Sequence, residues 1–129
     1  MPDPIPLRPR APPSALRNRR ILVVEDEYVL AQDLQRELED AGAEVVGPVP
    51  SIAGAMALLD AGAAPDAAIL DVNLGGEMVF PLAEALRERG VPFMFATGYD
   101  AWSLPQAFAE VPRCEKPFDV GRCLLMLFG

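Results

Sequence analysis

The chain of 129 residues contains no histidine and only one lysine, Lys116, beside ten arginines. Without histidine, the chain cannot form a Ser-His-Asp or Cys-His catalytic arrangement, a histidine-ligated metal site or a phosphohistidine. The two cysteines lie nine residues apart and form no CxxC pair. This spacing argues against a zinc site and a disulfide framework, and it is typical of a reducing, cytoplasmic compartment. These absences exclude several classes of enzyme.

Long apolar runs are also absent, and the charge is unevenly distributed. No run approaches the roughly 18 residues that span a bilayer, and the N-terminus lacks the apolar stretch of a secretory signal. Residues 1–20 carry a net charge of +4, whereas residues 21–129 carry −12. Because an acidic domain repels phosphate backbones, we expect no direct nucleic-acid binding. We expect a disordered Pro/Arg-rich tail over 1–19, one domain over 20–129, and no membrane insertion.

Within the expected domain, apolar runs alternate with helical patterns. The run at 21–24 is continuous and aliphatic, as in a strand buried on both faces, and the next segment has apolar residues at helical spacing until Gly42. This alternation predicts an α/β fold with a five-stranded parallel sheet and helices on both faces. The predicted strands are 21–24, 44–49, 67–70, 92–96 and 111–115, the last at an edge. The predicted helices are 27–41, 51–59, 79–89, a weak helix broken near Pro105, and 119–128.

Polar side chains follow four of the five predicted strands. Each of them alone has a structural explanation, such as a helix dipole, a cap or simple solvation. Such explanations do not predict that these side chains collect at one edge, and binding sites in parallel sheets lie outside the carboxyl ends of the strands. The residues at this edge are Glu25, Asp26, Asp71, Asn73, Thr97 and Lys116.

The types of these side chains indicate phosphate chemistry. Carboxylates that lie together repel one another, so they must bind a cation or keep a proton. Oxygen ligands alone favour a hard ion, most plausibly Mg²⁺, which usually serves a phosphate. One of the carboxylates can then be the nucleophile that forms an aspartyl phosphate. The Thr97 hydroxyl and the Lys116 ammonium fit the remaining phosphoryl charges, and a compact ammonium suits a single point contact better than the fork of an arginine.

The segments VVED, ILDVNL, FATGYD and EKPF resemble, in order and spacing, the response regulator receiver domain of two-component signalling. The resemblance covers residues 20–128. FATGYD is also similar to a subgroup named for its Phe-Ala-Thr-Gly motif (the FATGUY type), which often consists of small stand-alone regulators. The resemblance implies a flavodoxin-like (βα)5 fold with strand order 2-1-3-4-5, and phosphorylation by a sensor histidine kinase or a phosphotransfer protein.

The resemblance also implies residue roles, with some departures from the family pattern. Arg113 stands where receivers usually place a switching aromatic, so Tyr99 and Trp102 become candidate switch residues along with it. Glu25 stands where aspartate is commoner, and a Leu-Gly-Gly sequence follows Asn73 in place of the usual loop. The implied roles are phosphoacceptor for Asp71, Mg²⁺ ligand for Glu25, Asp26, Asp71 and the main-chain carbonyl of Asn73, and phosphate binding for Thr97 and Lys116.

We therefore expect a cytoplasmic phosphoacceptor that switches a protein-interaction surface. It is not expected to be an enzyme beyond self-phosphorylation from a phosphodonor and slow autodephosphorylation. No output domain is expected, since none would fit after Phe128. One alternative is a Mg²⁺-dependent phosphohydrolase, although Asn73 stands where such enzymes carry a second aspartate. Another is a degenerate receiver that acts only as a binding module. The downstream partner is open, as is homodimer formation.

Overall fold

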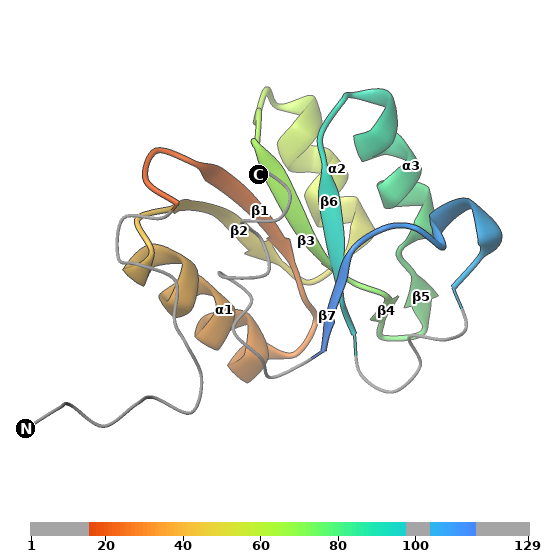
Figure 1. Ribbon diagram of the computed structural model, residues 1–129, viewed down its shortest axis with the longest axis horizontal. Helices are drawn as coiled ribbons and strands as arrows, with labels where there is room; N and C mark the ends of the chain where they lie inside the picture. Colours follow the sequence, from red (N-terminus) through yellow and green to blue (C-terminus); the bar gives the residue numbers. More distant parts are fainter. Residues whose placement is uncertain (1–15, 98–103, 116–129) are drawn as a thin grey trace, which may run out of the picture.

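A five-stranded parallel sheet forms the centre of the protein (Figure 1). The computed structural model describes residues 16–97 and 104–115. The strand order β2-β1-β3-β6-β7 is the predicted order 2-1-3-4-5, with the last two strands numbered later because a small hairpin precedes them. The flavodoxin-like fold is therefore confirmed. The strands of the sheet are β1 (Arg20–Val24), β2 (Glu44–Val49), β3 (Ala67–Asp71), β6 (Phe93–Thr97) and β7 (Arg113–Glu115).

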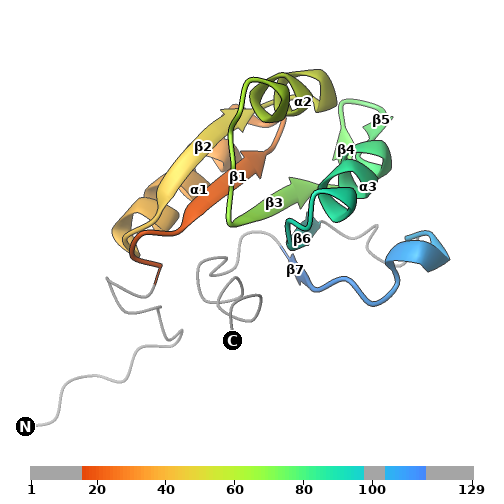
Figure 2. The same cartoon turned by 90° about the horizontal axis from the view of Figure 1, so that it is seen from above.

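Three helices cover the sheet, and each begins and ends within one residue of its prediction. They are α1 (Tyr28–Asp40), α2 (Ile52–Asp60) and α3 (Phe80–Glu88). Figure 2 shows α1 on one face of the sheet and α2 and α3 on the other. Within the described residues, no helix has the length and apolar content needed to cross a membrane. The predicted helix 119–128 lies outside the described residues.

Side chains of the central strands alternate between two hydrophobic clusters. In β1, Leu22 packs into the cluster under α2 and α3, whereas Ile21 and Val23 pack into the cluster under α1. This alternation follows from the two-residue period of a strand. Because both faces of β1 are covered, its sequence is a continuous apolar run rather than an alternating one.

The segment between β3 and α3 forms a hairpin that the sequence did not predict. Strands β4 (Asn73–Leu74) and β5 (Glu77–Met78) pair antiparallel across a two-residue loop. Gly75 and Gly76 both have positive φ angles, 64° and 97°, which a tight hairpin loop requires and glycine adopts at little cost. The site therefore borders a defined turn.

The segment between β6 and β7 carries little regular structure in its described part. A single 3-10 turn, η2 (Gln106–Phe108), follows Pro105 and stands where a weak helix was predicted. The turn buries Phe108 against Phe80, Phe93 and Phe95, whose ring centroids lie 5.4 to 6.3 Å from its own. One aromatic side chain thus anchors this segment to the sheet.

Leu16, inside the expected tail of 1–19, packs against the domain. The Leu16 side chain is fully buried and belongs to the same cluster as Leu38 and Ala41. Its backbone N–H donates to the carbonyl of Ala41 at 2.8 Å, and its own carbonyl accepts from the N–H of Arg19 at 3.0 Å. The expected boundary between residues 19 and 20 therefore divides a packed turn. Residues 1–15 of the expected tail lie outside the described residues.

Candidate functional site

Three carboxylates meet where β1 and β3 end. The two strands are neighbours in the sheet, with Val24 beside Leu70, so the residues that follow them reach the same edge. Glu25, Asp26 and Asp71 each offer one oxygen, and these oxygens lie within 4.8 Å of one another. The structure thus brings together three of the carboxylates that the sequence placed at strand ends.

The three carboxylates differ in how far they are buried. Glu25 is only 2% exposed, its backbone N–H donates to the carbonyl of Val49 at 3.0 Å, and its Oε1 accepts from the N–H of Glu27 at 3.1 Å. Asp71 is half-buried as the last residue of β3, and Asp26 is exposed. The site therefore has a fixed, buried carboxylate beneath two that a ligand from solution can approach.

This donor set fits a magnesium ion. Two ligands of one Mg²⁺ lie at most about 4.2 Å apart, since each bond is about 2.1 Å long, and the observed limit of 4.8 Å is close to that value. Magnesium also retains several waters, so it needs few protein ligands. Bringing three negative charges this close without a cation would be costly in a partly buried site. The residues present would therefore suit this ion.

Hairpin geometry makes the main-chain carbonyl of Asn73 available as a further ligand. In a two-residue hairpin, the residues flanking the loop form a hydrogen-bonded pair, so the next pair, Asn73 and Met78, is not hydrogen-bonded. The N–H of Val79 donates to the carbonyl of Val72 at 2.9 Å, which fits this alternation. The Asn73 side chain is engaged elsewhere, because its Oδ1 accepts from the N–H of Gly76 at 2.7 Å. The backbone carbonyl of Asn73 is therefore better placed than its side chain to accept a ligand.

The sheet register carries the predicted phosphate-binding residues toward the same edge. Asp71 pairs with Ala96, so the Thr97 backbone follows next to Asp71 on the neighbouring strand. Thr97 in turn pairs with Glu115, the residue before Lys116. Lys116 itself lies outside the described residues, as do the candidate switch residues Tyr99 and Trp102.

Arg113, the third candidate switch residue, lies away from this edge. It begins β7 beside Phe95, two residues before the pair that contains Thr97. Its side chain is exposed, and Nη2 donates to the carbonyl of Ala109 at 3.2 Å. The contact joins Arg113 to the η2 segment.

Sequence reasoning missed the part that the hairpin loop plays at this site. A Cβ atom added to Gly75 would lie 3.7 Å from Oδ2 of Asp26, so the loop lies next to the carboxylate of Asp26. The sequence Gly75-Gly76 could have indicated the turn, because two adjacent glycines are typical of a two-residue hairpin loop. The strands are too short for their alternation to be recognised.

Comparison with known proteins is consistent with this geometry. The chain matches the family model described as response regulator receiver domain over residues 21–112. It is 34% identical over 110 residues to "Sensory transduction protein LytT" of Bacillus subtilis (strain 168). This match covers 80% of the chain but 44% of LytT, so the chain spans less than half of that relative's length.

Solved structures show the same architecture. The solution structure of SdrG from Sphingomonas melonis Fr1 is 45% identical with a TM-score of 0.76, and the match covers 90% of this chain and 99% of that one. A BeF3-activated conformation of SdrG from Pseudomonas melonis Fr1 gives 45% identity and a TM-score of 0.72, covering 84% and 95% of the two chains. The response regulator PhyR from Brucella abortus is 25% identical with a TM-score of 0.69, covering 89% of this chain and 51% of PhyR.

Proposed function

Because the chain belongs to the response regulator receiver domain family, we propose that it is phosphorylated on Asp71 in a Mg²⁺-dependent reaction of two-component signalling. The observation that carries the proposal is the group of three carboxylates within 4.8 Å at the carboxyl edge of the sheet. Asp71 is the only one of the three that lies within a strand, as the last residue of β3. Its backbone is next to that of Thr97 on the neighbouring strand β6. That position gives it a fixed backbone and a side chain open to a phosphodonor.

In the proposed reaction, a carboxylate oxygen of Asp71 forms a bond to the phosphorus atom of the donor. The bond from phosphorus to the donor's histidine nitrogen breaks, and the leaving imidazole keeps the electron pair. Glu25, Asp26 and the Asn73 carbonyl would hold the ion. When bound, Mg²⁺ supplies positive charge opposite the phosphoryl oxygens. Thr97 and Lys116 are proposed to contact the remaining phosphoryl oxygens, Thr97 by its hydroxyl and Lys116 as a point charge.

The proposed phosphodonor is a sensor histidine kinase or a phosphotransfer protein in the cytoplasm. The proposed output is a change in a protein-binding surface, without direct contact to nucleic acid. The excess of acidic over basic side chains in residues 21–129 supports the second point, because it opposes binding to phosphate backbones.

Intact-mass measurement after incubation with acetyl phosphate tests the proposal. The wild-type chain should gain one phosphoryl group with Mg²⁺ and none with a chelator. Asp71→Asn should gain none, whereas Asp33→Asn, which alters an exposed carboxylate on α1, should behave as wild type. Full mass gain by Asp71→Asn would contradict the assignment. Sustained hydrolysis of a phosphate ester would favour the phosphohydrolase instead.

Beryllofluoride provides a second test, free of turnover. A BeF3-activated conformation is known for SdrG, which is 45% identical to this chain. Binding of beryllofluoride with Mg²⁺ should shift backbone amide resonances around Asp71 and Thr97. The same addition to Asp71→Asn should leave them unchanged, because the acyl-phosphate mimic needs the carboxylate.

A further inference from the structure

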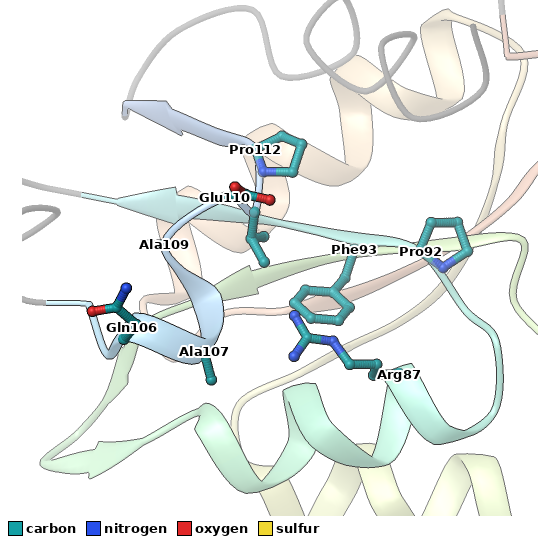
Figure 3. A pocket seen from close by; sticks show the side chains of 9 residues that line it. Arg87, Pro92, Phe93, Gln106, Ala107, Ala109, Glu110 and Pro112 are labelled. Atoms are coloured by element: carbon teal, nitrogen blue, oxygen red, sulfur yellow. The ribbon is translucent and has the colours of Figure 1, made fainter.

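A groove lies at the opposite end of the sheet from the carboxylates. We call it the α3–η2 groove, and its volume is about 450 Å³. It exists because a three-residue turn, rather than a helix, covers this part of the sheet between β6 and β7 in the described residues. Figure 3 shows Arg87 reaching in from α3 and Glu110 coming from the segment after η2. The groove is lined by Arg87, Phe93, Gln106, Glu110, Val111 and Pro112, among others.

Arg87 is held in place without an ion-pair partner. Its guanidinium carbon lies 4.8 Å from the ring centroid of Phe108 and 5.9 Å from that of Phe93. Both rings are almost fully buried, so they form a fixed support for the guanidinium plane. No carboxylate among residues 16–97 and 104–115 forms a salt bridge with Arg87, whereas Arg89, directly after α3, binds Asp60 at 2.9 Å. Arg87 is exposed, so its guanidinium is accessible to a ligand, and its planar fork suits bidentate binding of a carboxylate.

The groove has one basic and one acidic lining side chain, in a domain whose net charge is strongly negative. Arg113 lies at the rim, because its Nη2 donates to the carbonyl of Ala109, a lining residue. Among the residues that line the groove, Arg87 is the one cation and Glu110 the one carboxylate. The Arg87 guanidinium is complementary to an acidic group, and Glu110 disfavours a second acidic group beside it.

The shape of the groove favours a peptide over a small molecule. Pro92, Gln106, Ala107, Ala109 and Glu110 are all exposed, so the groove is open along its length. Sites for small molecules bury about 70 to 90% of the ligand surface, which an open groove does not do. An extended segment needs cover on one side only. It can place an apolar side chain on Val111 and Pro112 and a carboxylate on Arg87.

We propose that the α3–η2 groove binds a short extended segment of a partner protein that carries one carboxylate, with Arg87 as its main polar contact. Arg87 supplies the bidentate contact and its aromatic support fixes the geometry in advance, which lowers the entropy lost on binding. Binding in this groove does not require phosphorylation, so its test is independent of the chemistry at Asp71.

A titration of the ¹⁵N-labelled full chain with acetyl-Leu-Ala-Glu-Leu-Ala-amide tests this site. Saturable shifts are expected at Arg87, Phe93, Glu110 and Val111, at millimolar peptide. The matched peptide with glutamine in place of glutamate should bind about tenfold more weakly, as expected for a lost charge-assisted hydrogen bond. Equal binding of the two peptides, or no shift at these residues, would overturn the proposal.

Variants separate the Arg87 contact from general charge effects. Arg87→Gln should weaken the acidic peptide about tenfold, and Arg87→Lys several-fold, because lysine keeps the charge and loses the fork. Arg89→Gln removes an equal charge directly after α3, outside the groove, and should change the affinity less than twofold. Dispersed spectra of each variant establish that it is folded. Equal effects of Arg87→Gln and Arg89→Gln would refute the assignment.

Two further outcomes would identify a different occupant. Acetate binding to the groove as tightly as the peptide would make it a small-anion site. A concentration-dependent dimer that Arg87→Gln dissociates would make a second copy of this chain the occupant. Either result overturns the proposal of a partner segment.

Discussion

Leu16 provides the sharpest test of how the N-terminal segment contributes to the fold. Its side chain is fully buried in the cluster under α1, although sequence reasoning placed it in a tail. Leu16→Ala removes the buried methyl groups and leaves the backbone hydrogen bond to Ala41 intact. Substitutions of this type cost about 2 to 5 kcal/mol, the sum of the lost transfer free energy and the cavity.

The expected loss is large compared with the stability of a domain. A folded domain has a free energy of unfolding of about 5 to 15 kcal/mol. For about 100 residues, each 1 kcal/mol shifts the melting temperature by roughly 4 to 8 °C. Leu16→Ala should therefore lower the melting temperature by on the order of 10 °C or more.

Thermal and urea unfolding followed by circular dichroism measure this effect. Leu7→Ala makes the same chemical change within the expected tail and should leave the midpoints unchanged. Removal of residues 1–15 should also be tolerated, whereas removal of residues 1–18 should destabilise the domain, since it also deletes the contacts of Leu16. A Leu16→Ala protein as stable as Leu7→Ala would refute the reasoning.

The remaining predictions concern the carboxyl edge and α2. Gly75→Ala places a methyl group about 3.7 Å from Oδ2 of Asp26 and should weaken Mg²⁺ binding in calorimetry. Gly76→Ala, whose added Cβ meets nothing within 4 Å, should cost similar backbone strain and keep the Mg²⁺ affinity; equal losses in both variants would contradict a local effect. Lys116→Arg should slow phosphorylation by acetyl phosphate although it preserves the charge, and a wild-type rate would exclude the point-contact argument. Ser51→Ala removes an acceptor that binds a backbone N–H of α2 at 3.0 Å. It should lower the free energy of unfolding by about 1 kcal/mol, measured in urea, with Ser51→Thr retaining most of it.

The sequence predicted most of the sheet because its central strands are buried on both faces. Such strands appear as continuous apolar runs, and the burial of β1 and β3 accounts for the accuracy of those two predictions. Helix ends were predicted within one residue because glycines with positive φ angles, such as Gly42 and Gly90, lie two residues after the last helical residue.

The features that sequence reasoning missed depend on contacts between distant residues. A single leucine in a Pro/Arg-rich segment has no periodicity, and the burial of Leu16 is decided by Leu38 and Ala41, more than twenty residues later. The β4–β5 hairpin was missed because a two-residue strand shows no alternation. In the η2 segment, a 3-10 turn begins directly after Pro105, and the depth at which Phe108 packs depends on rings from α3 and β6.

The candidate site lies at the opposite end of the sheet from Leu16 and Arg87. Asp71 ends β3 at the carboxyl edge, where the order of strands alone brings polar side chains together. Leu16 and Arg87 lie toward the amino edge, where Phe93 begins β6 and where loops, not strand ends, decide the contacts. Predicting a site from the residues that follow each strand is therefore informative about the carboxyl edge only.

The same separation has an experimental consequence. At a temperature where each variant is folded, Arg87→Gln and Leu16→Ala should both keep wild-type phosphorylation of Asp71. Loss of phosphorylation in a folded Arg87→Gln protein would show instead that the two ends of the sheet are coupled through β6.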